Sequence, residues 1–175
     1  MIGLMKDVFV DIGVGELCTR LDVPYRHVRY VMEQGILPAG VDPSPDRGHH
    51  RLLDGSQAFW LGIVLKLKAS GVRTPLAGKI ASYAAESVRT ISQNLNWDTL
   101  FAPHQGRFRT EFQWYCDIGD LKYVRIATNA NPSKQGLDEF PWSPIGTRKS
   151  IDEASPVVTI RLDITRLAKL LANLT

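Results

Sequence analysis

The chain has 175 residues, a length that accommodates one domain or two small ones with a buried core. Hydrophobic residues make up 44% and charged residues 22% of the chain, which excludes a wholly disordered protein and a long coiled coil. The net charge of +3 permits a nucleic-acid partner without requiring one, and the basic residues are not concentrated in either half.

The sequence also indicates a compartment. No apolar run reaches the ~18 residues of a membrane span, and the first ten residues carry Lys6 and Asp7 where a signal peptide has an apolar core. The two cysteines, Cys18 and Cys116, lie far apart and form no Cys-x-x-Cys motif, so a disulfide scaffold is not expected. We therefore predict a cytoplasmic protein in which Cys18, within a helical pattern, is a small buried residue and not a reactive thiol.

Helices are predicted for the first part of the chain. Gly15 to Leu21 forms a short amphipathic helix. Pro24 suits the first turn of a second helix, which runs to about Gln34 and ends at Gly35. In this second helix the 3.6-residue period separates an apolar side (Val28, Val31 and Met32) from a cationic and aromatic side (Tyr25, Arg26, Arg29 and Tyr30).

A loop and two longer helices come next. Residues 37–55 are rich in Pro and Gly, which predicts a loop, with a hairpin ending in Gly48-His49-His50-Arg51-Leu52-Leu53. Broad apolar stripes then predict helices at about 56–70 and 74–91, separated by Gly71.

The second half has a different pattern. Alternating apolar residues predict strands at 109–117, 123–127 and 157–162, followed by an amphipathic helix at about 164–174. Residues 129–156 are predicted to be mostly loop, and Asp117 and Asp120, which flank Gly119, are interpreted as turn residues. The predicted fold class is α+β. Residues 1–91 form one domain, 92–106 a linker, and 107–175 a small dimerisation or sensing domain.

Several short motifs follow one another between Gly15 and Gly71. The first helix opens with Gly15-Glu16-Leu17, and the second covers Val23-Pro24-Tyr25-Arg26-His27-Val28-Arg29-Tyr30-Val31. Gln34-Gly35-Ile36-Leu37-Pro38 follows, and Gly48-His49-His50-Arg51 precedes the third helix. In this order and spacing, residues 12 to 90, about half of the chain, resemble the MerR family of bacterial transcription regulators.

This resemblance implies a winged helix-turn-helix that binds double-stranded DNA, with its second helix in a major groove about 12 Å wide. By resemblance, Arg26, Arg29 and Tyr30 contact phosphates and base edges, and Arg51 contacts the DNA backbone from the wing. Position on the helix or wing adds weaker candidates: Tyr25, His27, Arg47, His49 and His50. The chain departs from the family after the fourth helix, where Pro103 interrupts the long dimerisation helix, so the usual coiled coil is not expected.

Each candidate residue also has a simpler interpretation. Arg26 and Arg29 could form an ordinary solvated helix face, and Tyr30 could belong to the core. Adjacent histidines in a strand point to opposite faces and have no further ligand nearby, so His49 and His50 predict no metal site. The aromatic residues of the second half are interpreted as core in preference to a ligand pocket: Trp97, Trp114, Tyr115, Phe140 and Trp142.

The preferred functional hypothesis is a sequence-specific DNA-binding transcription regulator that recognises an inverted repeat as a homodimer. Strand 157–162 and the terminal helix are the predicted pairing surface. The alternative is an antitoxin-like protein that regulates its own operon and binds a partner protein through its second half. No cofactor, metal or membrane partner is predicted. An enzyme ranks last because the second half contains no catalytic motif.

Overall fold

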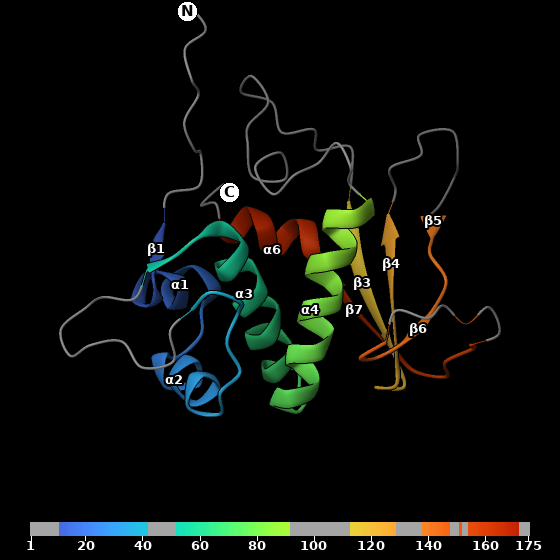
Figure 1. Ribbon diagram of the computed structural model, residues 1–175, viewed down its shortest axis with the longest axis horizontal. Helices are drawn as coiled ribbons and strands as arrows, with labels where there is room; N and C mark the ends of the chain where they lie inside the picture. Colours follow the sequence, from blue (N-terminus) through green and yellow to red (C-terminus); the bar gives the residue numbers. More distant parts are fainter. Residues whose placement is uncertain are drawn as a thin grey trace, which may run out of the picture.

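The computed structural model describes residues 11–41, 52–91, 113–128, 138–147, 151 and 154–171. The helices are α1 (Val14–Leu21), α2 (Tyr25–Glu33), α3 (Gly55–Ala69), α4 (Thr74–Ile91) and α6 (Ile164–Leu171). The strands are β1 (Ile12–Gly13), β2 (Leu52–Leu53), β3 (Trp114–Gly119), β4 (Tyr123–Thr128), β5 (Asp138–Glu139), β6 (Ser143–Pro144) and β7 (Thr159–Asp163). The predicted α+β class is confirmed, with helices grouped beside an antiparallel sheet (Figure 1).

A tight turn joins the first two helices. Asp22 has the left-handed φ of 51°, and the N–H groups of Asp22 and Val23 donate to the carbonyls of Thr19 and Cys18 at the end of α1. Pro24 then caps α2 in extended conformation, as the position of a helix-starting proline requires. The turn therefore redirects the chain within three residues and leaves α2 with one face toward the core.

A two-stranded antiparallel sheet follows from the pairing of β1 with β2, in which Ile12 lies opposite Leu53. It brings together the chain just before α1 and the chain just before α3. At the start of α3, the Asp54 carboxylate accepts from the Gln57 N–H at 2.8 Å, and the Gln57 side chain accepts from the Asp54 N–H at 3.1 Å. This capping box sets the first turn of α3.

The long helix α3 is buried on most of its surface and packs against α4 and α6. A Cβ on Gly62 would lie 3.3 Å from Leu167 Cδ1 of α6, so the absence of a side chain lets α6 approach closely. Lys66 Nζ donates to the Leu21 carbonyl at 2.6 Å, and Arg20 donates to the Leu171 carbonyl. These two cations satisfy carbonyls at the ends of α1 and α6 and tie three helices together.

The packing of α6 corrects one expectation. The terminal helix was predicted to offer its apolar face to a partner, but Ile164, Leu167, Ala168 and Leu171 are buried within the chain. They contact α1, α3 and β3, which lie before them in the sequence. An amphipathic pattern identifies an apolar face without identifying what covers it.

The larger sheet has the strand order β5-β4-β3-β7, with β6 also paired to β4, and every pairing is antiparallel. Trp114, Cys116 and Ile118 of β3 alternate toward the helices and are buried, as are Val124 and Ile126 of β4. Helices α4 and α6 cover this face (Figure 1). The short strands β5 and β6 lie in the stretch predicted as loop, where two-residue strands leave too short a pattern to detect.

The other face of the sheet carries a buried ionic network. Asp117 of β3 lies opposite Arg125 of β4 and Arg161 of β7 in the strand register. Its fully buried carboxylate accepts two hydrogen bonds from Arg161, at 2.6 and 2.7 Å, and one from Arg125, at 3.2 Å. Arg125 also pairs with Glu139 at 2.6 Å. The interpretation of Asp117 as a turn residue was wrong, because the alternating pattern extends through it to Gly119.

Asp120 is in the turn between β3 and β4, as predicted, with a φ of 50°. Its carboxylate accepts from the N–H groups of Val157 and Val158 at 3.2 and 2.9 Å. These two valines were predicted to begin the last strand. Instead, β7 begins at Thr159, after both valines. Their N–H groups donate to the Asp120 side chain and so are not paired with a neighbouring strand.

A single cluster of buried hydrophobic residues includes members of both predicted domains, from Ile12 and Leu17 to Ile118 and Leu171. The predicted linker, 92–106, lies outside the described residues. Among the described residues, the two halves of the sequence therefore share one core through α3, α4 and α6.

Candidate nucleic-acid interface

Helix α2 separates its side chains as the period predicted. Val28 and Val31 are fully buried and fix the helix to the core. On the opposite side Tyr25 is 61% exposed, and Arg26 and Arg29 are exposed beside it. A short helix held from behind, with arginines and an aromatic ring in solvent, has the form that enters a DNA groove.

Arg29 is not isolated on this face. Its Nε donates to Glu33 Oε1 at 2.6 Å, one turn along the helix, and both side chains are more than half exposed. The hydrogen bond and the charge of Glu33 raise the pKa of Arg29 above its ordinary value. The guanidinium is therefore permanently charged, and an incoming phosphate has to compete with Glu33 for it.

Tyr30 lies between its two predicted roles, a core residue and an exposed DNA contact. Its side chain is 45% exposed, and the ammonium of Lys68 lies 3.9 Å from the centre of its ring. Lys68, in the last turn of α3, is thereby brought to the α2 face, although the sequence analysis did not single it out. The signal in the sequence was its position: Lys66 and Lys68 are the basic residues of the last turn of an otherwise apolar helix.

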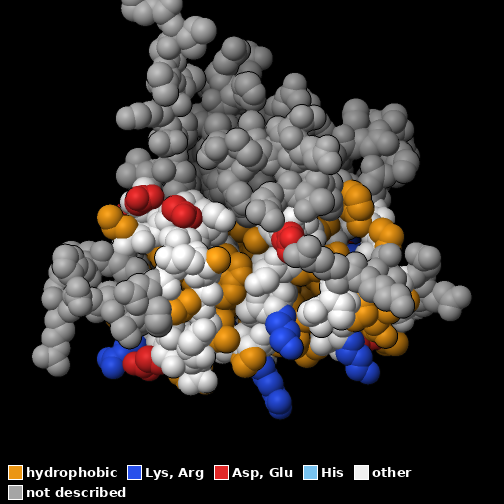
Figure 2. Space-filling model, viewed as in Figure 1, with side chains coloured by type: hydrophobic (Ala, Val, Ile, Leu, Met, Phe, Trp, Pro, Cys, Tyr) orange, Lys and Arg blue, Asp and Glu red, His pale blue; other side chains and the backbone are white. Residues whose placement is uncertain are grey.

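Cationic side chains are spread along one side of the molecule in the view of Figure 2. In Figure 2, separate Lys and Arg side chains project along the lower part of the view, where Figure 1 places α2, the lower ends of α3 and α4 and, to the right, the lower end of the sheet. An acidic side chain lies beside the cationic one at the α2 end of this side (Figure 2).

The remaining candidates divide into two groups. His27 is on α2 and half-buried, next to the exposed arginines. Arg47, His49, His50 and Arg51 lie outside the described residues, as does Trp97. The strand pair β1–β2 places one end of that candidate wing, at Leu52, beside Gly13 at the start of α1.

No cluster of three or more His, Cys, Asp or Glu side chains able to hold a metal ion occurs in the described ranges. Cys18 and Cys116 are buried free thiols, and burial raises the pKa of both. High thiol pKa values keep these groups protonated and chemically inert at neutral pH.

The aromatic residues of the second half lie mostly in packed positions. Trp114 and Trp142 are buried, and Phe140 packs against the core. Arg125 lies 4.3 Å above the Trp142 ring, and Arg161 lies 5.2 Å from the centre of the Tyr115 ring. These rings therefore support the ionic network on the outer face of the sheet.

None of the helices in the described ranges combines the length and apolar character needed to cross a bilayer. No protein-family model matches the chain, and no curated protein matches it significantly.

Proposed function

We propose that this protein is a sequence-specific DNA-binding transcription regulator that acts as a homodimer, with a MerR-like winged helix-turn-helix formed by its N-terminal half. The observation that carries the proposal is α2: Val28 and Val31 anchor it, and Tyr25, Arg26 and Arg29 project from it into solvent. The tight turn from α1 and the β1–β2 pair beside α3 support the same arrangement.

In this proposal α2 enters the major groove, and its arginines bind phosphates or the acceptor edge of guanine. Lys68 reaches the same side of the molecule through its contact with Tyr30 and adds a phosphate contact. Because the net charge is only +3, affinity depends on these placed cations and on pairing of two copies.

Binding is tested by selecting duplexes from a random pool and measuring affinity for the selected sequence at a series of salt concentrations. We expect a selected inverted repeat and an affinity that falls as salt rises. Arg29→Ala should weaken binding, reduce the salt slope by about 1 if it contacts a phosphate, and leave the melting temperature nearly unchanged. Arg166→Ala, which removes an exposed arginine of α6, is the matched control and should bind like the unmodified protein.

Glu33→Gln sharpens this test. The change removes the competitor that holds Arg29 and one negative charge from the proposed interface, so it should strengthen DNA binding. Selection of no common sequence, or an affinity insensitive to salt, would contradict the proposal. Equal effects of Arg29→Ala and Arg166→Ala would remove α2 from the interface.

The antitoxin-like alternative drew on the modest net charge and on an apolar terminal helix available to a partner. That helix face is buried against α1, α3 and β3, so we propose the regulator alone.

A further inference from the structure

The larger sheet ends at β7, whose outer edge faces away from β3. Strand β7 pairs with β3 from Thr159 to Asp163, and no other described strand lies beside it. The contact with β3 extends by one more position, because the Asp120 N–H donates to the Val158 carbonyl at 2.9 Å. Residues 158–163 therefore follow β3 along an edge that the described strands leave open.

The backbone groups of β7 alternate between its two edges. In an antiparallel pair, a residue that bonds its partner is followed by one whose N–H and C=O point the other way. The Val158 carbonyl points to β3, so the backbone groups of Ile160 and Leu162 do so as well. Those of Thr159 and Arg161 then point to the open edge. This edge therefore offers the N–H and C=O of both residues to an added strand.

The side chains along this edge alternate as well. Ile160 lies opposite the buried Ile118 and is itself partly buried against the core. Leu162 has the equivalent position two residues farther along and is also partly buried. Val158, two residues before Ile160, is 61% exposed. On the face that the helices cover, the edge thus carries an apolar row that the chain buries only in part.

From these observations we infer that β7 pairs with β7 of a second copy, antiparallel about a two-fold axis at Ile160. Residues 158–162 read apolar, polar, apolar, polar, apolar in both directions, so a second copy running the opposite way matches them. The two Ile160 side chains then meet, and Val158 lies against the partner's Leu162. The backbone groups of Thr159 bond those of the partner's Arg161.

Charge and backbone direction select this register over its neighbours. A shift by one residue would bring the apolar row of one copy opposite the polar row of the other. An axis at Arg161 would place two guanidinium groups directly opposite each other, which is destabilising. An axis at Thr159 would need the N–H of Val157, which already donates to Asp120 Oδ2 at 3.2 Å. With the axis at Ile160, Arg161 lies opposite the uncharged Thr159.

The inference rests on the proposed function in one respect, since it specifies the interface of the proposed homodimer. It does not require DNA binding. In this dimer the two larger sheets continue into each other, and the helices of both copies cover the same face of the joined sheet, because the apolar rows pair with each other.

Disulfide cross-linking of the full chain tests the register. Ile160→Cys places two thiols on the two-fold axis, with Cα atoms about 4.5 Å apart, within the range of a disulfide. After mild oxidation we expect most of this variant to run as a covalent dimer on a non-reducing gel. Thr159→Cys, the matched control, separates the thiols by about 7 Å along the strand and should run as a monomer. The unmodified chain should also run as a monomer, because Cys18 and Cys116 are buried.

A proline tests the backbone contacts and does not depend on the folding of the Ile160 variant. Thr159→Pro removes an N–H that points to the open edge, at the first residue of β7, where proline is tolerated. The circular dichroism spectrum should be unchanged, whereas sedimentation equilibrium should show dimerisation weakened at least tenfold, because symmetry removes two hydrogen bonds. Thr159→Ala keeps the N–H and should dimerise like the unmodified chain.

The interface would be overturned by a monomeric unmodified chain, by Thr159→Pro dimerising as well as Thr159→Ala, or by a folded Ile160→Cys that does not cross-link. Cross-linking of Thr159→Cys to itself would overturn the register. The duplex selection described above separates these failures from that of the proposed function. A cross-linked dimer that selects no DNA sequence would overturn the proposed function and leave the interface standing. A monomer that binds a selected duplex would overturn the interface and leave the DNA contact of α2 standing.

Discussion

Cationic side chains of the same chemistry have different roles in this protein because their surroundings differ. Lys66 and Arg20 donate to backbone carbonyls at helix ends, and Arg161 neutralises a buried carboxylate. Arg26 and Arg29 instead extend into solvent from α2. Only cations with exposed head groups can exchange their present partner for a phosphate at low cost.

The buried thiol of Cys116 should make the free energy of unfolding depend on pH above neutrality. Burial, and then the nearby Asp117 carboxylate, raises the pKa of this thiol above the ~8.5 of an unfolded cysteine. The native state keeps the proton that the unfolded state loses, so the free energy of unfolding should fall as pH rises above ~8.5, by up to ~1.4 kcal/mol per pH unit. Denaturant titrations at pH 7.5, 8.5 and 9.5, roughly spanning that thiol pKa, measure this slope.

The control for this prediction is Cys116→Ala. This change lowers the absolute stability by leaving a small cavity, but it should flatten the pH dependence between about 8.5 and 9.5. The pKa of Cys18 is also raised, and since Cys18 is present in both proteins, its effect cancels in the comparison. Parallel pH profiles for the two proteins would contradict the assignment.

Among the elements, β3 shows how register determines surroundings. Alternation sends Cys116 and Ile118 to the helices and Asp117 to the other face. Because β3 is central, Asp117 has a strand on each side, and both neighbours present an arginine at the same level. The carboxylate is thus fully buried and fully paired.

Removing the charge of Asp117 should therefore be costly. Asp117→Asn leaves Arg125 and Arg161 close together with half their neutralisation lost, and we expect a loss of about 3 kcal/mol in the free energy of unfolding, measured by urea denaturation. The triple change Asp117→Leu, Arg125→Met and Arg161→Met removes all three charges and should recover most of that loss. A loss below about 1 kcal/mol for Asp117→Asn would mean that the network contributes little.

At the scale of the whole molecule, helix α6 packs into the same core as the N-terminal helices. Its apolar residues lie on α1 and α3, and the Arg20 side chain donates to its final described carbonyl, that of Leu171. A change in α6 is therefore expected to affect the N-terminal half as well. Among the described residues, one edge of the larger sheet is at β7.

Strand β7 ends the sheet order, so its outer edge has no described strand beside it. Val157 and Val158, just before it, are 92% and 61% exposed. We predict that two copies pair along this edge, and that Val158→Lys shifts the solution mass from dimer to monomer, because an edge lysine opposes strand pairing. Leu52→Lys, at a residue 59% exposed on β2, should leave the dimer intact. Sedimentation equilibrium distinguishes these outcomes, and a monomeric unmodified protein would contradict the prediction.

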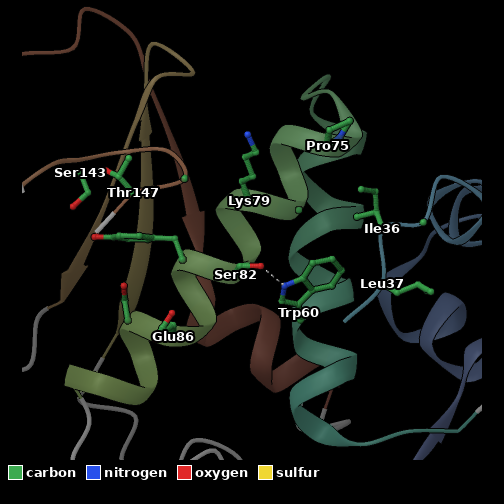
Figure 3. Close-up of a pocket in the computed structure, with 14 residues that line it drawn as sticks. Ile36, Leu37, Trp60, Pro75, Lys79, Ser82, Glu86, Ser143 and Thr147 are labelled. Atoms are coloured by element: carbon green, nitrogen blue, oxygen red, sulfur yellow. Dashed lines mark hydrogen bonds between the residues drawn. The ribbon is translucent and has the colours of Figure 1, made fainter. Parts of the chain in front are cut away.

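Local patterns in the sequence were sufficient for the helices, the exposed face of α2 and the approximate positions of β3 and β4, because periodicity depends on neighbours only a few residues apart. The predicted strand 109–117 ended two residues before β3 does, and its first residues, 109–112, lie outside the described residues. Local patterns could not show which elements bury the apolar face of α6 or that Lys68 lies over the Tyr30 ring. They also could not show that Asp117 pairs with Arg161, which is 44 positions away in the sequence. These contacts depend on how elements pack and on strand register, so only the tertiary structure decided them. A groove over α4 is of the same kind, since its lining residues come from four separate segments: the one after α2, α3, α4 and the one around β6 (Figure 3).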